Sequence, residues 1–88
     1  MYKLEYSVKT TLWVWDDIEK VRKPIIRANT MEVPLPKLAM PLQTLLREAS
    51  HLLKEDLLWY KVWRDDTLIG YVYKRKGYIT IESFEAIK

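Results

Sequence analysis

The sequence has no cysteine, a single histidine and two glycines in 88 residues. Without cysteine it can form neither a disulfide framework nor a thiolate metal site, so packing alone has to hold the domain together. Side-chain amides are almost absent as well, with only Asn29 and Gln43, whereas Lys, Arg and Glu are frequent. This composition is typical of heat-adapted proteins and predicts a thermophilic source.

Long apolar runs are also missing, although 49% of the residues are hydrophobic and 31% are charged. No stretch reaches the roughly 20 apolar residues of a membrane span. Lys3, Glu5 and Lys9 interrupt the first stretch before the apolar part of a secretion signal could form. We therefore expect a globular, cytoplasmic protein with no membrane partner, folded as a single domain over residues 1–88.

The first fifteen residues alternate between apolar and polar types. Even positions from Tyr2 to Val14 are mostly apolar and the first odd positions are polar, which predicts one long, half-buried strand. Trp13 and Trp15 interrupt this pattern because they fall on the otherwise polar face. Large rings on that face predict that something covers this end of the strand.

The segment after this strand is harder to interpret. Asp16 and Glu19 have the spacing of a helix capping box, which predicts a short helix that Pro24 limits. Residues 25–33 are rich in β-branched side chains but lack a clear period, so we expect a loop that includes a possible edge strand. Residues 33–36 read as an extended, proline-containing connection.

The second half of the chain has the clearest pattern. Leucines and one alanine recur every three or four residues from Leu42 to Leu57 after Pro41, which predicts an amphipathic helix. Three extended runs follow at residues 58–64, 68–74 and 78–84, separated by short polar breaks. The predicted fold class is α+β: a mainly antiparallel sheet, made of the long N-terminal strand and a C-terminal three-strand meander, packed by one amphipathic helix.

Possible reactive clusters have simpler explanations. Glu48, His51 and Glu55 have the spacing of a carboxylate metal site, but they lie opposite the leucine stripe with no second motif to complete it, so we interpret them as a solvated helix face. Two Asp-Asp pairs, at residues 16–17 and 65–66, fit capping and turn chemistry. We predict no catalytic residue, metal or cofactor; a metal-dependent nuclease is the enzymatic alternative.

The strongest functional signal is the mixture of aromatic and basic residues in the meander. If Leu58, Tyr60, Val62, Leu68 and Val72 pack under the helix, the opposite alternation, which includes Ile69, places rings and cations on the outer face. The predicted binding residues are Trp59, Lys61, Trp63, Arg64, Tyr71, Tyr73, Lys74, Arg75 and Lys76. Stacked rings beside cations suit bases and phosphates. The alternative is structural: cross-strand pairs, a second small core under residues 34–40, or a homodimer interface.

A second basic cluster consists of Lys20, Arg22, Lys23 and Arg27. It fits a phosphate contact or an ordinary solvated face, and a net charge of +3 favours polyanions only weakly. Our first hypothesis is a non-catalytic accessory subunit of a nucleic-acid-handling complex that contacts DNA, RNA or a larger protein. The alternative is a pure protein-interaction factor, such as a complex-stabilising subunit or a virus-encoded inhibitor, without nucleic-acid contact.

Overall fold

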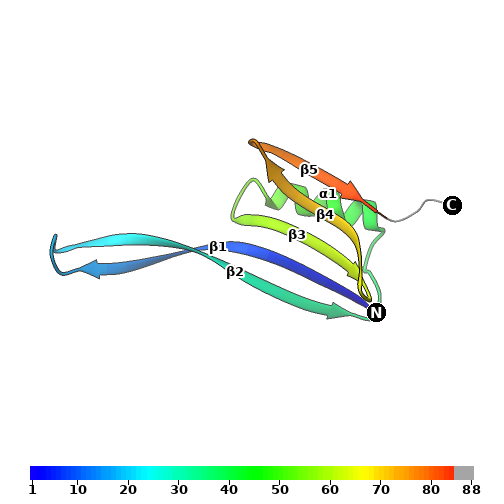
Figure 1. The fold of residues 1–88 in the computed structure, drawn as a ribbon, viewed down its shortest axis with the longest axis horizontal. Helices are drawn as coiled ribbons and strands as arrows, with labels where there is room; N and C mark the ends of the chain where they lie inside the picture. Colours follow the sequence, from blue (N-terminus) through cyan, green and yellow to red (C-terminus); the bar gives the residue numbers. More distant parts are fainter. Residues whose placement is uncertain (85–88) are drawn as a thin grey trace.

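The computed structural model describes residues 1–84 as one antiparallel sheet with a helix on one face (Figure 1). In chain order the elements are β1 (Tyr2–Asp16), β2 (Val21–Leu35), α1 (Leu42–Leu52), β3 (Leu57–Arg64), β4 (Thr67–Arg75) and β5 (Tyr78–Ser83). The strands lie in the order β2-β1-β3-β4-β5, and every neighbouring pair is antiparallel. The predicted α+β class, with its long first strand, C-terminal meander and single packing helix, is confirmed.

The core lies between α1 and the side of the sheet it covers. The most deeply buried hydrophobic side chains come from the helix, from its C-terminal turn and from strands β3 and β4: Leu42, Leu46, Ala49, Leu53, Leu57, Tyr60, Val62, Ile69 and Val72. The leucine period predicted most of this list. Burial of these side chains is the main source of stability in a chain that has no disulfide.

Gly70 allows the helix to approach β4 closely. A Cβ atom placed at Gly70 would lie 2.8 Å from Leu46 Cδ2 and 3.3 Å from Leu42 Cδ1. The missing side chain therefore makes room for the two leucines that anchor the helix on the sheet. At the β4–β5 turn, Lys76 and Gly77 both have positive φ, as the tight two-residue hairpin turn requires.

The predicted short helix after Asp16 is wrong. Residues 17–20 form a turn, and β2 then runs for 15 residues, antiparallel to the whole of β1. Asp16 does accept backbone N–H groups, from Ile18 at 2.9 Å and Glu19 at 3.1 Å, but the chain turns back as a hairpin. The predicted hydrogen bonds to Asp16 therefore form, but they close a turn. The β-branched residues that follow favour a strand over a helix.

Both prolines of β2 fit its place at the edge of the sheet. Pro24 pairs with Trp13 and Pro34 pairs with Lys3, so both occupy even positions of the strand. Proline has no backbone N–H, so it is tolerated at positions of an edge strand where that group would point away from the neighbouring strand, here β1. Prolines on this open edge also disfavour the addition of a further strand there.

Three finer predictions also need correction. The helix ends at Leu52, and Leu57 begins β3 instead of closing the helix. An irregularity between Val62 and Trp63 shifts the pairing with β4, so that Ile69 is buried in the core whereas Leu68 pairs with Trp63 and is only partly buried. Strict alternation had assigned these two residues to the opposite faces. Leu58, predicted to pack under the helix, is 38% exposed.

The molecule is elongated because the β1–β2 hairpin extends far beyond the rest of the sheet (Figure 1). Its dimensions are 61 × 28 × 19 Å, and its radius of gyration is 16.5 Å. A compact chain of this length would have a radius of gyration of about 12 Å. Among the described residues, no helix has the length and apolar character needed to cross a membrane.

Candidate partner-binding surfaces

The face of the sheet opposite α1, called here the outer face, is built from aligned cross-strand rows. One row runs from Ser7 through Trp59 and Tyr73 to Thr80, and the next from Glu5 through Lys61 and Tyr71 to Glu82. A third joins Lys3, Trp63 and Leu68. The register therefore brings five of the nine predicted residues together: Trp59, Lys61, Trp63, Tyr71 and Tyr73.

The cations of the outer face are held against its rings. Lys61 Nζ lies 4.8 Å from the ring centre of Trp59 and 5.2 Å from that of Tyr71. Lys3 Nζ lies 5.4 Å from the ring centre of Trp63 and 3.7 Å from a carboxylate oxygen of Glu32. Both ammonium groups thus interact with rings of the outer face itself, and those rings are only partly exposed.

Carboxylates are also part of this surface. Trp63 Nε1 donates to Glu5 Oε1 at 3.2 Å, and the Tyr73 hydroxyl donates to Glu82 Oε1 at 3.0 Å. The bond to Glu82 raises the pKa of the Tyr73 hydroxyl, with smaller contributions from burial and from the carboxylate charge. Together with Glu32, these carboxylates balance the cations of this face, Lys3, Lys61 and Arg75, so the face has no excess of positive charge to attract phosphate.

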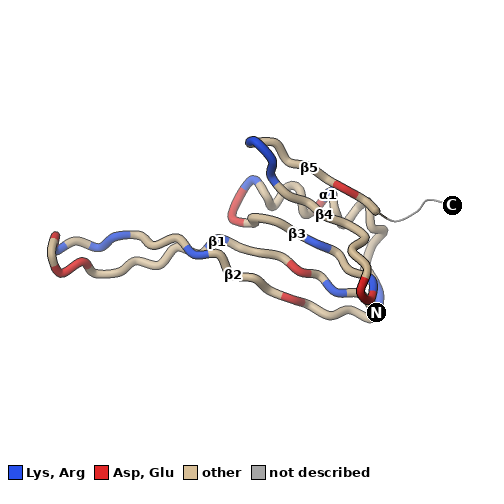
Figure 2. The backbone as a smooth tube through the Cα atoms, viewed as in Figure 1, with Lys and Arg blue, Asp and Glu red and all other residues tan. Residues whose placement is uncertain are grey.

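Of the other four predicted residues, Arg75 lies at the end of the outer face, one alternation step beyond Tyr73, and Arg64, Lys74 and Lys76 lie away from that face. Arg64 ends β3 beside the β3–β4 turn, whereas Lys74 and Arg75 end β4 and Lys76 forms the β4–β5 turn at the opposite end of the sheet. Alternation along β4 places Lys74 on the helix side, in register with Ile79. Lys74, Arg75 and Lys76 therefore form a separate basic turn (Figure 2).

The most exposed apolar surface lies on the hairpin instead. Pairing between β1 and β3 ends at Val8, so residues 9–28 form a two-stranded ribbon, which we call the arm, with no third strand among the described residues. One face of the arm, the Trp face, carries Trp13 and Trp15 beside Ile26 on β2, and these side chains are 64%, 59% and 61% exposed. The other face, the aliphatic face, carries Leu12, Val14, Val21 and Ile25, all at least 40% exposed.

The tip of the arm is a tight polar turn around one apolar side chain. Hydrogen bonds from the backbone of Glu19 and the ammonium group of Lys23, and then from the backbone of Ile18, hold the pKa of the Asp16 carboxyl below its usual range. Lys23 Nζ lies 3.2 Å from Asp16 and 2.7 Å from Glu19. Lys20 has a φ of 55°, and Ile18, at 94% exposure, projects from this ordered turn.

The second predicted basic cluster lies entirely on the arm. Lys20 is in the turn, and Arg22, Lys23 and Arg27 are on β2 (Figure 2). Lys23 forms ion pairs with the carboxylates of Asp16 and Glu19, and Arg22 is the cross-strand partner of Trp15. The cluster is thus spread among apolar side chains, with Asp16, Asp17 and Glu19 at the end of the arm that would meet a partner first.

The sequence did not predict the arm. It marked Trp13 and Trp15 as rings on a polar face that something should cover, and within residues 1–84 both are left exposed. Ile18 and Ile26 were missed because the first was assigned to a helix and the second to a loop. A β-strand interpretation of residues 21–35 would have paired Ile26 with Thr11, beside the two tryptophans.

The remaining motif residues do not assemble into a site. Glu48 and His51 are exposed on α1, and Glu55 lies beyond the end of the helix. Within residues 1–84 no three His, Asp or Glu side chains are grouped as metal ligands would be. Comparison of this chain with protein-family models, curated proteins and solved structures gives no match.

Proposed function

We propose that this protein is a non-catalytic accessory factor that binds a larger protein partner through the Trp face of its arm. The observation that carries the proposal is the exposure of Trp13, Trp15 and Ile26 on a ribbon that nothing else in residues 1–84 covers. Tryptophan side chains contribute the most binding energy in protein interfaces when a partner desolvates them. Exposed apolar side chains grouped on one projecting element are typical of such interfaces.

The charges of the arm favour a protein over a nucleic acid as the partner. Three carboxylates, those of Asp16, Asp17 and Glu19, occupy the tip, where an arm entering a DNA groove would make its first phosphate contacts. Basic and acidic groups interspersed around a central apolar patch are the usual composition of a protein interface rim.

The test compares capture of partners from an extract of the encoding organism by the wild-type chain and by a Trp13→Ser/Trp15→Ser variant. Capture of one stoichiometric protein that survives nuclease and high salt and is lost in the variant supports the proposal. Tyr78→Ser is the matched control, because Tyr78 is 78% exposed and lies at the far β4–β5 turn. Equal capture by all three chains would exclude the Trp face.

Direct nucleic-acid contact is a second candidate, favoured by one specific feature. The basic turn gathers Lys74, Arg75 and Lys76 beside the exposed ring of Tyr78, which is the pairing of cations and a ring that single strands bind. In this case oligonucleotide affinity falls steeply with salt and is lost when the three cations are changed to Glu. Absence of binding at low salt removes the candidate.

A further inference from the structure

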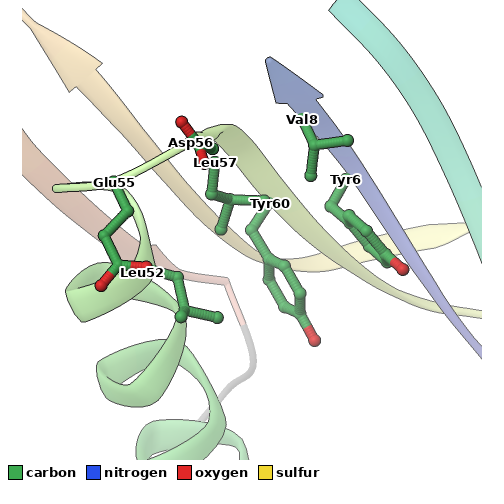
Figure 3. Close-up of a pocket in the computed structure, with 7 residues that line it drawn as sticks. All are labelled: Tyr6, Val8, Leu52, Glu55, Asp56, Leu57 and Tyr60. Atoms are coloured by element: carbon green, nitrogen blue, oxygen red, sulfur yellow. The ribbon is translucent and has the colours of Figure 1, made fainter. Parts of the chain in front are cut away.

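A cavity of about 320 Å³ opens on the helix side of the sheet, where the arm leaves the body (Figure 3). Tyr6, Val8, Leu57 and Tyr60 from two strands and Leu52 from the helix supply its apolar lining, and Glu55 and Asp56 lie at its rim. The cavity exists because α1 packs on β4 and β5, which leaves this part of β1 and β3 uncovered. Its volume suits one or two large apolar side chains.

The cavity and the aliphatic face of the arm form one continuous surface. Tyr6 and Val8 occupy even positions of β1, and alternation carries the same side of the strand on to Leu12 and Val14. The backbone N–H of Lys9 donates to the carbonyl of Asp56 at 2.7 Å, which fixes the base of the arm at the rim of the cavity. Each molecule thus has an apolar cavity at the base of its arm and an apolar side chain, Ile18, at the tip.

From this arrangement we propose that two copies of the chain form a homodimer in which the arms lie antiparallel on their aliphatic faces and each Ile18 occupies the other copy's cavity. A two-fold axis through the middle of the arms brings each tip to the other base, so both contacts form together. The free part of β1, residues 9–16, spans about 26 Å, which sets the length of the contact.

The surface area of the chain agrees with an interface of this size. Its accessible surface is 6811 Å², whereas a compact monomer of 10.6 kDa would expose about 5,500 Å². The excess of roughly 1,300 Å² includes both faces of the arm, so the share on the aliphatic face, together with the cavity, approaches the roughly 800 Å² that each partner buries in a stable dimer. An isolated two-stranded ribbon is only marginally stable in water, and a second ribbon on its aliphatic face would stabilise it.

The charges at the two ends are compatible with this contact. At the tip, Lys23 pairs with Asp16 and Glu19, which leaves the cations Lys20 and Arg22 against Asp17. The rim of the cavity carries the carboxylates of Glu55 and Asp56. With three cations and three carboxylates in residues 16–23, the tip is neutral overall, so it approaches the acidic rim without net repulsion. The Trp face stays exposed in this dimer, so the inference is independent of the proposed binding of a larger protein.

The absence of cysteine allows a direct test of the arrangement. Ile18→Cys protein is mixed with Leu52→Cys protein under mild oxidation, and the expected product is a disulfide between the two different chains. Both positions are exposed in the monomer, at 94% and 52%, so neither change threatens folding. Tyr78→Cys in place of Leu52→Cys is the control and should give at least tenfold less of the mixed product.

Sedimentation equilibrium supplies the second measurement. The wild-type chain is expected to sediment with twice the 10.6 kDa monomer mass as concentration rises, and Ile18→Asp/Val14→Asp should weaken this association at least tenfold. Trp13→Ser/Trp15→Ser should leave it unchanged. A wild-type monomer at every concentration, or equal cross-linking to Tyr78→Cys, overturns the inference. Capture of a larger protein that depends on the Trp face would still stand in that case, so the two proposals fail separately.

Discussion

The body of this molecule and its arm use the same residue types in opposite ways. In the body, leucine, isoleucine, valine and tyrosine lie between α1 and the sheet, and five of these side chains are almost completely inaccessible. In the arm, two tryptophans and several isoleucines and valines are 40% exposed or more, and no part of residues 1–84 forms a layer over either face. The difference shows that hydrophobic composition alone does not define a core; a covering element does.

The largest expected effect separates two isoleucines, one from each region. Ile69 is 1% exposed in the core and Ile26 is 61% exposed on the Trp face. We expect Ile69→Ala to lower the free energy of unfolding by about 3 kcal/mol, because it leaves a cavity between helix and sheet. Ile26→Ala should change it by less than about 0.5 kcal/mol. Urea denaturation of both variants checks this, and equal losses would show that the arm is part of the cooperative core.

The next effect concerns the close contact between helix and sheet. Gly70→Val should cost about 2 kcal/mol, because its side chain would overlap Leu46 and push the helix away from β4. Thermal unfolding measures the loss, and a Gly70→Val/Leu46→Ala double variant, which restores space, should lose less than the two single changes added together. Strict additivity would mean that the two positions do not meet.

A smaller effect concerns pH and the cavity at the base of the arm. Burial, with a further contribution from Tyr6, raises the pKa of Tyr60 from 10.0 to about 12. Because the unfolded chain ionises at lower pH than the folded one, this contribution to stability is complete below pH 10 and is lost as pH rises toward 12. Stability measured across this range should fall less steeply in Tyr60→Phe; an identical slope would contradict the assignment.

The smallest effect is confined to the tip of the arm. Asp16→Ala removes the acceptor of the Ile18 and Glu19 N–H groups, so these amides should exchange with solvent faster while the amides of β3 and β4 are unaffected. The fold lowers the pKa of Asp16 below its usual value of 3.8. The carboxylate therefore stabilises the turn fully above pH 3.8, and this stabilisation is lost as pH falls through the lower pKa of the folded chain. Protection at low pH equal to that at neutral pH would contradict this.

The body was predictable from sequence because its patterns and its contacts agree. The leucine spacing after Pro41 and the three extended runs gave the helix, the meander and most of the core. The irregularity at Val62 and Trp63, which buries Ile69 instead of Leu68, was not predictable because alternation carries no signal for a shifted register.

The arm was not predicted because its local signals point in different directions. Asp16 and Glu19 form the hydrogen-bonding pattern of a helix start, and the same carboxylate contacts also close a hairpin turn. Pro24 is expected to limit that helix, whereas in the structure it lies within β2, because an edge strand accepts proline. Five of the candidate residues do lie on one face of the sheet, as strand alternation predicts. Which of them contact one another depends on the strand register, which composition does not reveal.

The central claim is that partners bind the arm and that the body holds it in place. Site-specific photo-cross-linking tests this most directly, with a photoreactive residue placed in turn at Trp13, Trp15, Tyr71 and Tyr73 and the products analysed in extracts of the encoding organism. We expect a strong adduct to one larger protein from the two arm positions and little from the outer face. Adducts from Tyr71 and Tyr73 alone would contradict it.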